Sequence, residues 1–382
     1  MIFETVKFSD ITVNHDKKRI PLSTMKRSKR QGSYRYYGAQ GVIDYIDDYI
    51  FDGKYLLIAE DGENLKSKKQ NIAQLAEGRF WVNNHAHIVQ CNERCRLEYL
   101  CFMLNSMDLS GYITGSAQPK LSQANMNSIS FGIPSVEMQD LILSVILPIE
   151  KRIATNTAIN ENLEQQAQAL YKAWFVDFEP FGGVMPDDWK IISLGKLCDS
   201  ISKKHKFNKD ELIFLNTGDV ENGMILHNNY YEVSQMPGQA KKSIAINDIL
   251  YSEIRPINKH FAYVNFVADD YVVSTKLMVL RAKGISPRRL YQFLTMPDTL
   301  KELQVEAESR SGTFPQIRFD NIQQLEMIVA SEQVEKEYSE RLNTIYSMID
   351  TNNSENKRLS ALRDTLLPKL MNGEIDVSAV QV

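Results

Sequence analysis

The chain has 382 residues, of which 43% are hydrophobic and 24% charged, and its net charge is −4 at neutral pH. This composition is that of a globular protein long enough for two or three domains, and a negative net charge taken alone argues against a nucleic-acid partner. No apolar run approaches the ~18 residues of a membrane span, and MIFETVKFSD lacks the order of a signal peptide, so we expect a cytoplasmic protein with no membrane partner.

Residues 1–135 are predicted to form a first domain, a mixed α/β globule. Alternating or β-branched runs such as KYLLIAED and RFWVNNHAHIVQ predict strands, and LEYLCFMLNSM predicts a short helix. The block carries 17 Lys and Arg against 14 Asp and Glu, whereas the acidic residues outnumber the basic ones in 136–186 and 328–382. Charge asymmetry of this kind suggests blocks with different partners.

The segment MKRSKRQGSYRYYG interleaves basic side chains with tyrosines. This mixture suits phosphate contacts that position a protein on DNA, with base-edge or stacking contacts nearby. A solvated basic loop with core tyrosines would have the same composition. NLKSKKQN is a weaker version of the pattern, and a histidine of the following strand is expected to face either the core or DNA. The candidate DNA-binding residues of this part are Lys26, Arg27, Lys29, Arg30, Tyr34, Arg35, Lys66, Lys68, Lys69 and His85.

A loop of small residues, GSAQPK, begins at Gly115. Small residues let the backbone approach a ligand closely, and the proline stiffens the turn. Gln118 and Lys120 supply the hydrogen-bond donors that base edges require. We therefore add both to the candidate DNA-binding residues.

A heptad pattern occupies most of residues 136–182, which are predicted to form a central long helix with an aromatic end cluster. Positions from Ile142 to Trp174 step alternately by four and three residues. About 37 residues at ~1.5 Å each would give a rod of roughly 55 Å. Because Pro148 lacks an N–H and would kink a helix interior, we expect the long helix to begin there, after a separate short helix.

Residues 183–330 are predicted to form a second mixed α/β domain. DDYVVSTKLMVL and HFAYVNFVA predict strands, RRLYQFLTM predicts a helix, SKKHKFNK is basic, and SGTFPQ matches the GSAQPK loop. The candidate DNA-binding residues here are Lys203, Lys204, Lys206, Lys241, Lys242, Arg255, Lys276, Arg310, Thr313, Gln316 and Arg318.

Residues 331–382 are predicted to form a C-terminal long helix and tail that repeat the heptad pattern at an offset of 196, with two asparagines again in register. Two such stripes in one chain can bury each other as an antiparallel intramolecular coiled coil, in which polar positions fix the register. Alternatively, the asparagines face solvent. The predicted helix-pairing residues are Ile146, Ile149, Ile153, Asn156, Asn160, Leu163, Leu342, Ile345, Ile349, Asn352, Asn356 and Leu359.

The internal repeat extends to the two globules. VKFSDI corresponds to IISLGKL, WVNNHAHIV to VVSTKLMVL, and GSAQPKLSQANMNSISFGIP to SGTFPQIRFDNIQQLEMIVA, at offsets of 186, 191 and 196. The offsets grow because the second copy carries small insertions. The chain is therefore organised as globule, long helix, globule and long helix.

The sequence contains no motif of a catalytic site. Phosphate-binding loops, a dinucleotide-binding glycine motif, a nucleophile elbow and an H-E-x-x-H zinc motif are all missing from it. Cys91, Cys95, Cys101 and Cys198 are few and unevenly spaced, so we expect reduced cysteines rather than disulfides or a zinc site. His85 and His87 alternate, but no further ligands are spaced to complete a metal site.

Four segments together resemble the specificity subunit of type I restriction–modification systems: YYGAQGVIDYIDDYIFDGKYLLIAEDG, GSAQPKLSQANM, QALYKAWFVDFEPF and LRDTLLPKLMNGEIDV. The resemblance implies two target-recognition domains, each reading one half of a split site in double-stranded DNA, and two paired helices that set the spacing. It also implies no catalysis and no cofactor in this chain. S-adenosylmethionine, ATP and Mg would belong to two modification and two ATP-driven restriction subunits. The sequence of the second loop, SGTFPQ, differs from the GSAQPK sequence of the first.

Two other classes of protein share parts of these features. A stand-alone two-headed DNA-binding repressor would bind tightly without partners, and an interaction scaffold would use only the coiled coil. The aromatic cluster that includes Tyr171, Trp174 and Phe178 could dock a helix on its neighbour or contact a modification subunit. We expect a mixture of the two roles, with Trp174 chiefly structural.

Overall fold

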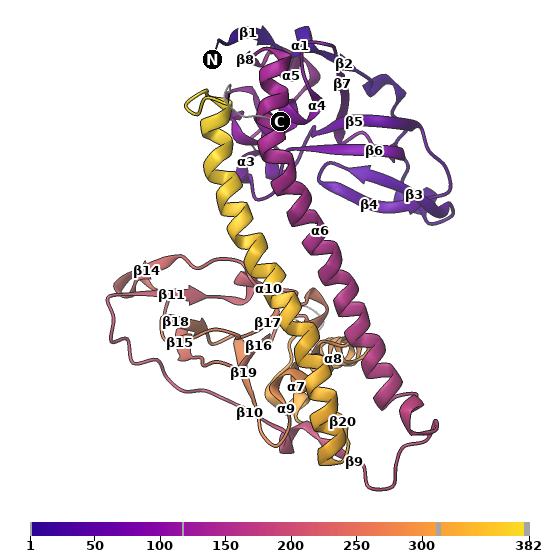
Figure 1. Cartoon of the computed structure of the whole chain (residues 1–382), viewed down its shortest axis with the longest axis vertical. Coiled ribbons are helices and arrows are strands. Elements are labelled where there is room, and N and C mark those ends of the chain that lie inside the picture. The colour runs from indigo at the N-terminus through magenta and orange to yellow at the C-terminus, as the bar shows by residue number, and fades with distance from the viewer. Residues whose placement is uncertain (1, 117, 311–314, 378–382) are drawn as a thin grey trace. The chain divides into compact units, whose positions relative to one another are not determined.

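The structure is a computed structural model that describes residues 2–116, 118–310 and 315–377. It divides into two compact units: unit 1 comprises Met1–Asn156 with Ser354–Val382, and unit 2 comprises Thr157–Asn353. Each unit contains a mixed α/β globule and a portion of each of two long helices (Figure 1). The predicted fold class, two mixed α/β domains with two long antiparallel helices, is confirmed.

The long helices are α6 (Val136–Phe175) and α10 (Glu332–Met371), each of 40 residues. The prediction that the first would break at Pro148 was wrong, because α6 continues through this residue. Pro148 is exposed, so its ring does not interrupt the face of α6 that packs. Tertiary packing of that face outweighs the one hydrogen bond that the proline removes.

In unit 1 the first part of α6 runs antiparallel to the last part of α10. Asn156 Nδ2 donates to Asn356 Oδ1 at 2.9 Å and to Glu355 Oε2 at 2.9 Å. Arg152 donates to both oxygens of the same Glu355, at 3.0 and 2.9 Å. Leu370 lies in the core of unit 1 with Ile142 and Ile146. The C-terminal segment thus completes the core of the N-terminal globule.

In unit 2 the remaining parts of the two helices pair in the same way. Asn160 Nδ2 donates to Asn353 Oδ1 and Asn352 Nδ2 donates to Asn160 Oδ1, both at 2.8 Å. Asn156 and Asn160 are 0% and 8% exposed, so the alternative in which these asparagines face solvent is excluded. Of the other predicted pairing residues, some are buried (Ile146, Leu163, Leu342, Ile349) and some half-buried (Ile149, Ile153, Ile345, Asn352, Asn356, Leu359).

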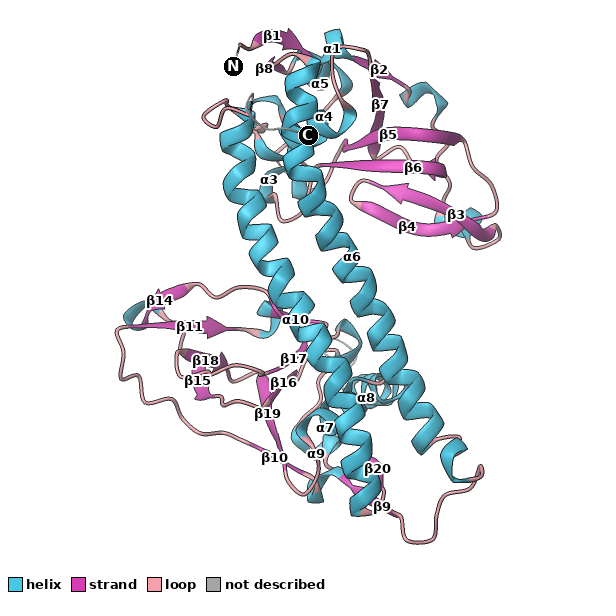
Figure 2. Cartoon of the chain, in the orientation of Figure 1, coloured by secondary structure: helices cyan, strands magenta, loops and turns pink. Residues whose placement is uncertain are grey.

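The globule of unit 1 is built on a six-stranded sheet of order β2-β7-β5-β6-β3-β4 (Figure 2). A two-stranded sheet, β1-β8, lies beside the first helix, and the core includes Phe8, Tyr99 and Leu104. The elements are β1 (Glu4–Lys7), α1 (Phe8–Ile11), β2 (Thr12–Asn14), α2 (Thr24–Arg27), β3 (Gln31–Gly38), β4 (Gly41–Ile46), β5 (Phe51–Ala59), α3 (Asn64–Ser67), β6 (Ala73–Val82), β7 (Ala86–Cys91), α4 (Leu97–Ser106), α5 (Gln123–Ser128) and β8 (Ser130–Ile133).

The globule of unit 2 repeats this plan with its strands divided between two four-stranded sheets, β10-β19-β16-β17 and β14-β11-β18-β15. The pair β20-β9 corresponds to β8-β1 of unit 1. The elements are β9 (Lys190–Ser193), β10 (Cys198–Ser200), β11 (Glu211–Leu215), β12 (Val220–Glu221), β13 (Met224–Ile225), β14 (Tyr230–Glu232), β15 (Ala240–Ser243), β16 (Ile249–Ser252), β17 (Phe261–Tyr263), β18 (Tyr271–Ser274), β19 (Leu277–Ala282), α7 (Pro287–Thr295), α8 (Pro297–Arg310), α9 (Phe319–Ile322) and β20 (Glu326–Val329).

The aromatic cluster at the end of α6 encloses a buried arginine. Arg289 of α7 is 0% exposed, and its guanidinium carbon lies 3.7 Å from the ring centre of Phe175, 4.7 Å from Tyr171 and 5.0 Å from Tyr338. Ring faces attract a cation when water is excluded. The cluster therefore joins α6, α7 and α10 within unit 2, and Trp174, at 8% exposed, is part of that core.

We expect Asn156→Ala to lower the free energy of unfolding by about 1–3 kcal/mol, because it removes the donor that Asn356 Oδ1 faces in a buried position. Urea denaturation followed by circular dichroism measures this difference. The control is Lys151→Ala, an exposed position of the same helix, for which a change within about 0.5 kcal/mol is expected. Equal stability of the two variants would contradict the assignment.

Trp174→Ala should destabilise unit 2 by about 3–5 kcal/mol, because the indole packs against Tyr338 and Phe181 in the core. Val176, which is 54% exposed, supplies the matched control as Val176→Ala. Thermal unfolding of both variants makes the comparison. An unfolding midpoint that Trp174→Ala leaves unchanged would contradict the structural role of the indole.

Candidate nucleic-acid interface

The predicted basic and aromatic segment of unit 1 forms α2 and the strand β3. Lys26 and Lys29 are exposed, whereas Arg27 donates to Asp44 at 2.8 Å and to the Leu22 carbonyl at 2.8 Å. Arg27 also lies over the Tyr36 ring. It therefore braces the α2–β4 contact rather than facing solvent. The hydrogen bonds from Arg27 and Gln31 hold the pKa of the Asp44 carboxyl below its usual value.

Three further members of this segment are half-buried. Arg30 pairs with Asp47 at 2.9 Å and its guanidinium lies over the Trp81 ring. Arg35 donates to the Glu77 carbonyl. Tyr34 packs against Tyr49, with ring centres 5.1 Å apart. These contacts hold the β3–β4 hairpin against its neighbours, and the three side chains remain half-buried.

A second set of candidates meets where β5 ends and β7 begins. The Glu60 N–H donates to the His85 carbonyl at 2.9 Å, and the Glu60 carbonyl accepts from the Leu121 N–H at 2.8 Å. The Gly62 N–H donates to the Pro119 carbonyl at 3.1 Å. Three segments distant in sequence are thereby joined into one corner by backbone hydrogen bonds.

The side chains of this corner form two close pairs, each of a basic residue with an acidic one. Lys120 Nζ lies 3.2 Å from Glu60 Oε1, and His85 Nδ1 lies 2.8 Å from Asp61 Oδ2. The side chains of Lys120 and His85 are about half exposed, at 52% and 48%. Burial raises the pKa of Glu60, but the hydrogen bond from Arg19, the nearby His87 and the hydrogen bond from Lys120 outweigh burial and leave the pKa below its usual value.

Beneath the corner lies a buried Asp16–His87 pair. His87 Nδ1 lies 2.6 Å from Asp16 Oδ2, and His87 Nε2 lies 2.8 Å from the Leu121 carbonyl. Burial raises the pKa of Asp16, but hydrogen bonds from His87 and from the Ile88 N–H outweigh burial and lower it overall. The pair supports the loop that carries Lys120. The two histidines of one strand therefore differ, with His87 in the core and His85 at the surface.

The corresponding corner of unit 2 has the same backbone hydrogen bonds. The Glu253 N–H donates to the Lys276 carbonyl at 3.0 Å, and the Glu253 carbonyl accepts from the Ile317 N–H at 2.8 Å. The Arg255 N–H donates to the Pro315 carbonyl at 3.2 Å. Lys276 Nζ lies 3.3 Å from Glu253 Oε2 and 3.4 Å from Gln316 Oε1. Gln316 and Lys276 were both predicted candidates, and the structure brings them together.

The remaining candidates are placed separately. Lys66 donates to the Ser116 carbonyl at 3.1 Å and so lies against the 114–120 loop, whereas Lys68 donates to the Met107 carbonyl at 2.9 Å, at the end of α4. Lys242 donates to the carbonyls of Thr275 and Leu277, burial lowers its pKa, and it therefore supports β15 instead of facing solvent. The other exposed candidates are Lys69, Gln118, Lys203, Lys204, Lys206, Lys241 and Arg318, whereas Thr313 and the Arg310 side chain lie outside the described residues.

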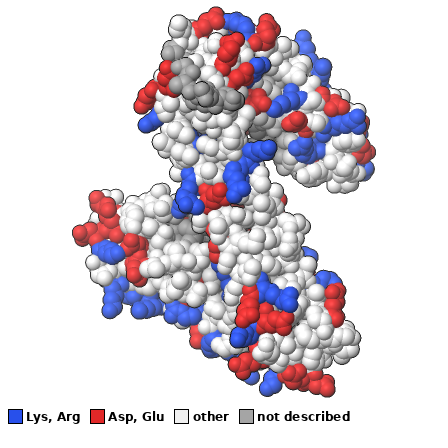
Figure 3. Space-filling model, viewed as in Figure 1, with Lys and Arg blue, Asp and Glu red and all other residues white. Residues whose placement is uncertain are grey.

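On the face shown in Figure 3, the charged side chains of the described residues do not form one patch of a single sign. Lys and Arg side chains are interspersed with Asp and Glu in unit 1, and they form a row along one edge of unit 2. The segment of unit 2 with exposed Lys203, Lys204 and Lys206 is held to β15 by a bridge between Lys204 and Lys242. Each unit therefore exposes several basic side chains locally.

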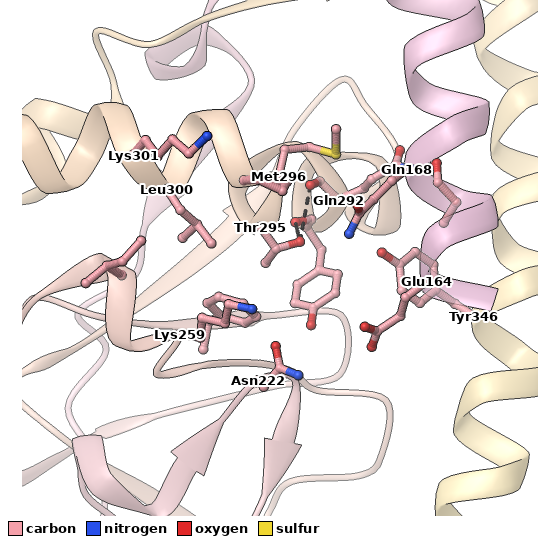
Figure 4. A pocket seen from close by; sticks show the side chains of 15 residues that line it. Glu164, Gln168, Asn222, Lys259, Gln292, Thr295, Met296, Leu300, Lys301 and Tyr346 are labelled. Atoms are coloured by element: carbon pink, nitrogen blue, oxygen red, sulfur yellow. Dashed lines mark hydrogen bonds between the residues drawn. The ribbon is translucent and has the colours of Figure 1, made fainter. Parts of the chain in front are cut away.

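A pocket of about 200 Å³ in unit 2 has no arrangement typical of catalysis. Glu164 of α6 and Lys259 and Asn222 of the globule point into it (Figure 4). Burial raises the pKa of Glu164. Among the described residues, no group of three or more His, Cys, Asp or Glu side chains could hold a metal ion. In that same part of the chain, no helix has the length and apolar character needed to cross a membrane.

Sequence reasoning missed Glu60, Asp61, Glu253 and Asp16. A signal was available for Glu60 and Glu253, because each follows a strand of the internal repeat and precedes the turn that meets the proline loop. Single acidic residues after a strand are common, and only the backbone hydrogen bonds identify these two as equivalent. Asp16 has no local signal, since its partner His87 is 71 residues away.

Two repeated α/β globules, each with a polar corner and half of a helix pair, define a two-domain protein built by internal duplication. The family model for the type I restriction modification DNA specificity domain matches residues 3–165 and 186–361, so the chain belongs to that family. The two matched segments correspond to the two copies of the repeat.

Several known proteins are similar to this chain. The HindI specificity subunit of Haemophilus influenzae is 39% identical over 182 residues, which cover 47% of this chain and 40% of that protein. The MjaIX specificity subunit of Methanocaldococcus jannaschii is 22% identical over 303 residues, covering 73% and 69%. The crystal structure of a type I system S subunit from M. genitalium, 13% identical, matches with a TM-score of 0.64 over 97% of this chain and 96% of that one. This last match shows a shared fold.

Asp16→Asn should lower the free energy of unfolding by about 1–3 kcal/mol at pH 7, because the charged acceptor of His87 is lost. Since the folded pKa of Asp16 is lowered, its contribution is complete above the unfolded pKa of about 3.9 and is lost as the pH falls through the folded value. The difference between variant and wild type should therefore shrink below pH ~4. Urea denaturation at several pH values measures it.

The matched control is Glu93→Gln, an exposed carboxyl of the same unit, for which no such difference is expected. A pH-independent gap between Asp16→Asn and wild type would show that the lost hydrogen-bond geometry, and not the carboxylate charge, accounts for the effect.

Proposed function

We propose that the chain is the DNA specificity subunit of a type I restriction–modification complex. Residues 1–135 and 183–330 are the target-recognition domains, and each reads one half of a bipartite site in double-stranded DNA. The paired helices set the distance between the half-sites. The chain acts in the cytoplasm and has no catalytic role of its own.

The observation that carries this proposal is that one backbone framework recurs in both units with different side chains at its exposed corner. The N–H and carbonyl of Glu60 and of Glu253 make equivalent hydrogen bonds. A duplicated framework with unlike surface residues suits the reading of two unlike half-sites. Base edges differ fully in the major groove, where Lys, Gln and Arg are the usual readers.

The helix pair supports the spacing role. Both α6 and α10 are unbroken over 40 residues, and buried asparagine pairs fix their register in each unit. Because the register is fixed, the two helices cannot slide along one another, and the helix pair has one defined length. Methylation and cleavage belong in this proposal to two modification and two restriction subunits. These subunits would bind S-adenosylmethionine, ATP and Mg.

Genome-wide methylation mapping in cells that carry this chain with its modification subunits tests the proposal. We expect one bipartite motif with two unlike half-sites. Electrophoretic shifts of the assembled complex at two salt concentrations provide a second measurement, because phosphate contacts make DNA affinity fall steeply with salt. An interaction scaffold would show no salt-dependent affinity, and a stand-alone repressor would bind tightly without modification subunits.

Duplicating seven residues in each helix, 157–163 in α6 and 353–359 in α10, should lengthen the spacer by about three base pairs. Seven residues preserve the heptad pattern and add roughly 10 Å, at ~1.5 Å per residue against ~3.4 Å per base pair. Methylation mapping reads both half-sites and the spacer. The control is the same duplication in α6 alone, which should disrupt the pairing. An altered half-site with unchanged spacing would contradict the spacing role.

A further inference from the structure

We infer that the corner at the end of β5 in unit 1 and of β16 in unit 2 is the base-reading site of each domain. Specificity is set at three equivalent positions, occupied by Gly62, His85 and Lys120 in unit 1 and by Arg255, Lys276 and Gln316 in unit 2. This inference rests on the proposed function and adds the residues that would determine which bases each half-site contains.

The equivalence of the positions comes from backbone hydrogen bonds alone. In each unit the N–H of the glutamate after the strand donates to the turn before the paired strand, β7 or β19, and the glutamate carbonyl accepts an N–H from the proline loop. Two residues later, an N–H donates to the carbonyl of the loop proline, at 3.1 Å for Gly62 and 3.2 Å for Arg255. Because none of these bonds uses a side chain, the framework stays the same whatever residues occupy the three positions.

A glutamate is the constant member of the corner, and its partner changes. Glu60 pairs with Lys120 of the loop, at 3.2 Å, whereas Glu253 pairs with Lys276 of the turn, at 3.3 Å. The side chains of Glu60 and Glu253 are only 15% and 20% exposed. Each glutamate is a positioning residue that holds one lysine in a defined place, so that the ammonium group meets a guanine edge in one geometry.

The side chains at these positions, which are exposed or half-buried, provide hydrogen-bonding groups of different kinds. Unit 1 presents an imidazole and an ammonium group with Asp61 beside them, and unit 2 presents an ammonium, a carboxamide and a guanidinium group with Ile254 beside them. Donors and acceptors that differ at equivalent places predict different bases in the two half-sites.

Arg255 supplies an independent argument. Its φ of 43° lies in the left-handed region, where Gly62 occupies the equivalent position with a φ of 115°. A non-glycine residue there is strained, and strained residues are frequent at binding sites without being confined to them, as the exposed Lys259 with a φ of 58° shows. Arg255 is exposed, so core packing does not explain why an arginine stands where glycine would relieve the strain.

The test compares Arg255→Gly with Lys259→Gly in the full chain assembled with its modification subunits. Lys259 is also exposed and has a φ of 58°, so both substitutions remove one positive charge and one strained backbone position from unit 2. Arg255→Gly should preserve or raise the thermal unfolding midpoint and relax one or two base pairs of a single half-site. Discrimination at those base pairs should fall about 5- to 150-fold. Lys259→Gly should leave the motif unchanged.

A double variant, Lys276→His with Gln316→Lys, gives unit 2 the residues of unit 1 at two positions and should change base preference in the same half-site. The other half-site and the spacer should remain unchanged. If the wild-type complex methylates a bipartite motif and both Arg255→Gly and the double variant retain it unchanged, the inference is wrong and the proposed function stands. If the wild type methylates no such motif, the proposed function itself is wrong.

Discussion

The structure depends on the mutual burial of two long apolar stripes that belong to one chain. Neither α6 nor α10 could expose its heptad face to water, and each covers the other in both units. The hydrogen bond between Asn156 and Asn356 joins residues 200 positions apart. Unit 1 is therefore discontinuous, because Leu370 and Val377 complete the core of the N-terminal globule. Removing the last 29 residues of unit 1, 354–382, would open that core, although these residues follow the whole of unit 2 in the sequence.

Apolar packing alone would not fix how the two helices align. A shift of seven residues would preserve most apolar contacts but would place Asn156 opposite Ile349 and Asn160 opposite Ile345. Each buried carboxamide would then lose its partner, at a cost of about 1–3 kcal/mol. The asparagine pairs thus select one register at some expense in stability. Asn156 pairs with Asn356, the repeat counterpart of Asn160, and Asn160 pairs with Asn352, the repeat counterpart of Asn156. This exchange of partners is what antiparallel pairing between two copies of one helix produces.

The elements that the sequence predicts well are those with a local period. The heptad seam, the strands around KYLLIAED and the helices at LEYLCFMLNSM and RRLYQFLTM are all present. The prediction of a break at Pro148 was wrong because the free-energy cost of a proline in the helix is smaller than the stabilisation from packing a 40-residue helix. Arg27, Lys242 and the buried Arg289 show a second limit: a basic residue in the sequence does not reveal whether its partner is solvent, a carbonyl or an aromatic ring. The corner was predicted only in part, through Lys120, His85, Arg255, Lys276 and Gln316. Backbone hydrogen bonds between distant segments leave no local pattern in the amino-acid sequence.

The corner also explains how one framework can tolerate different surfaces. Its hydrogen bonds use the N–H and carbonyl groups of Glu60 or Glu253 and of their neighbours, so substitution of an exposed side chain leaves the framework intact. Of the residues that make these hydrogen bonds, only the glutamate and the buried loop proline are identical in the two units. The support beneath differs, since unit 1 has the Asp16–His87 pair whereas unit 2 has an apolar residue, Met278, at the position that corresponds to His87. The framework is thus defined by backbone groups, and its exposed side chains can differ without loss of the fold. A recognition domain requires this separation if its target sequence is to change.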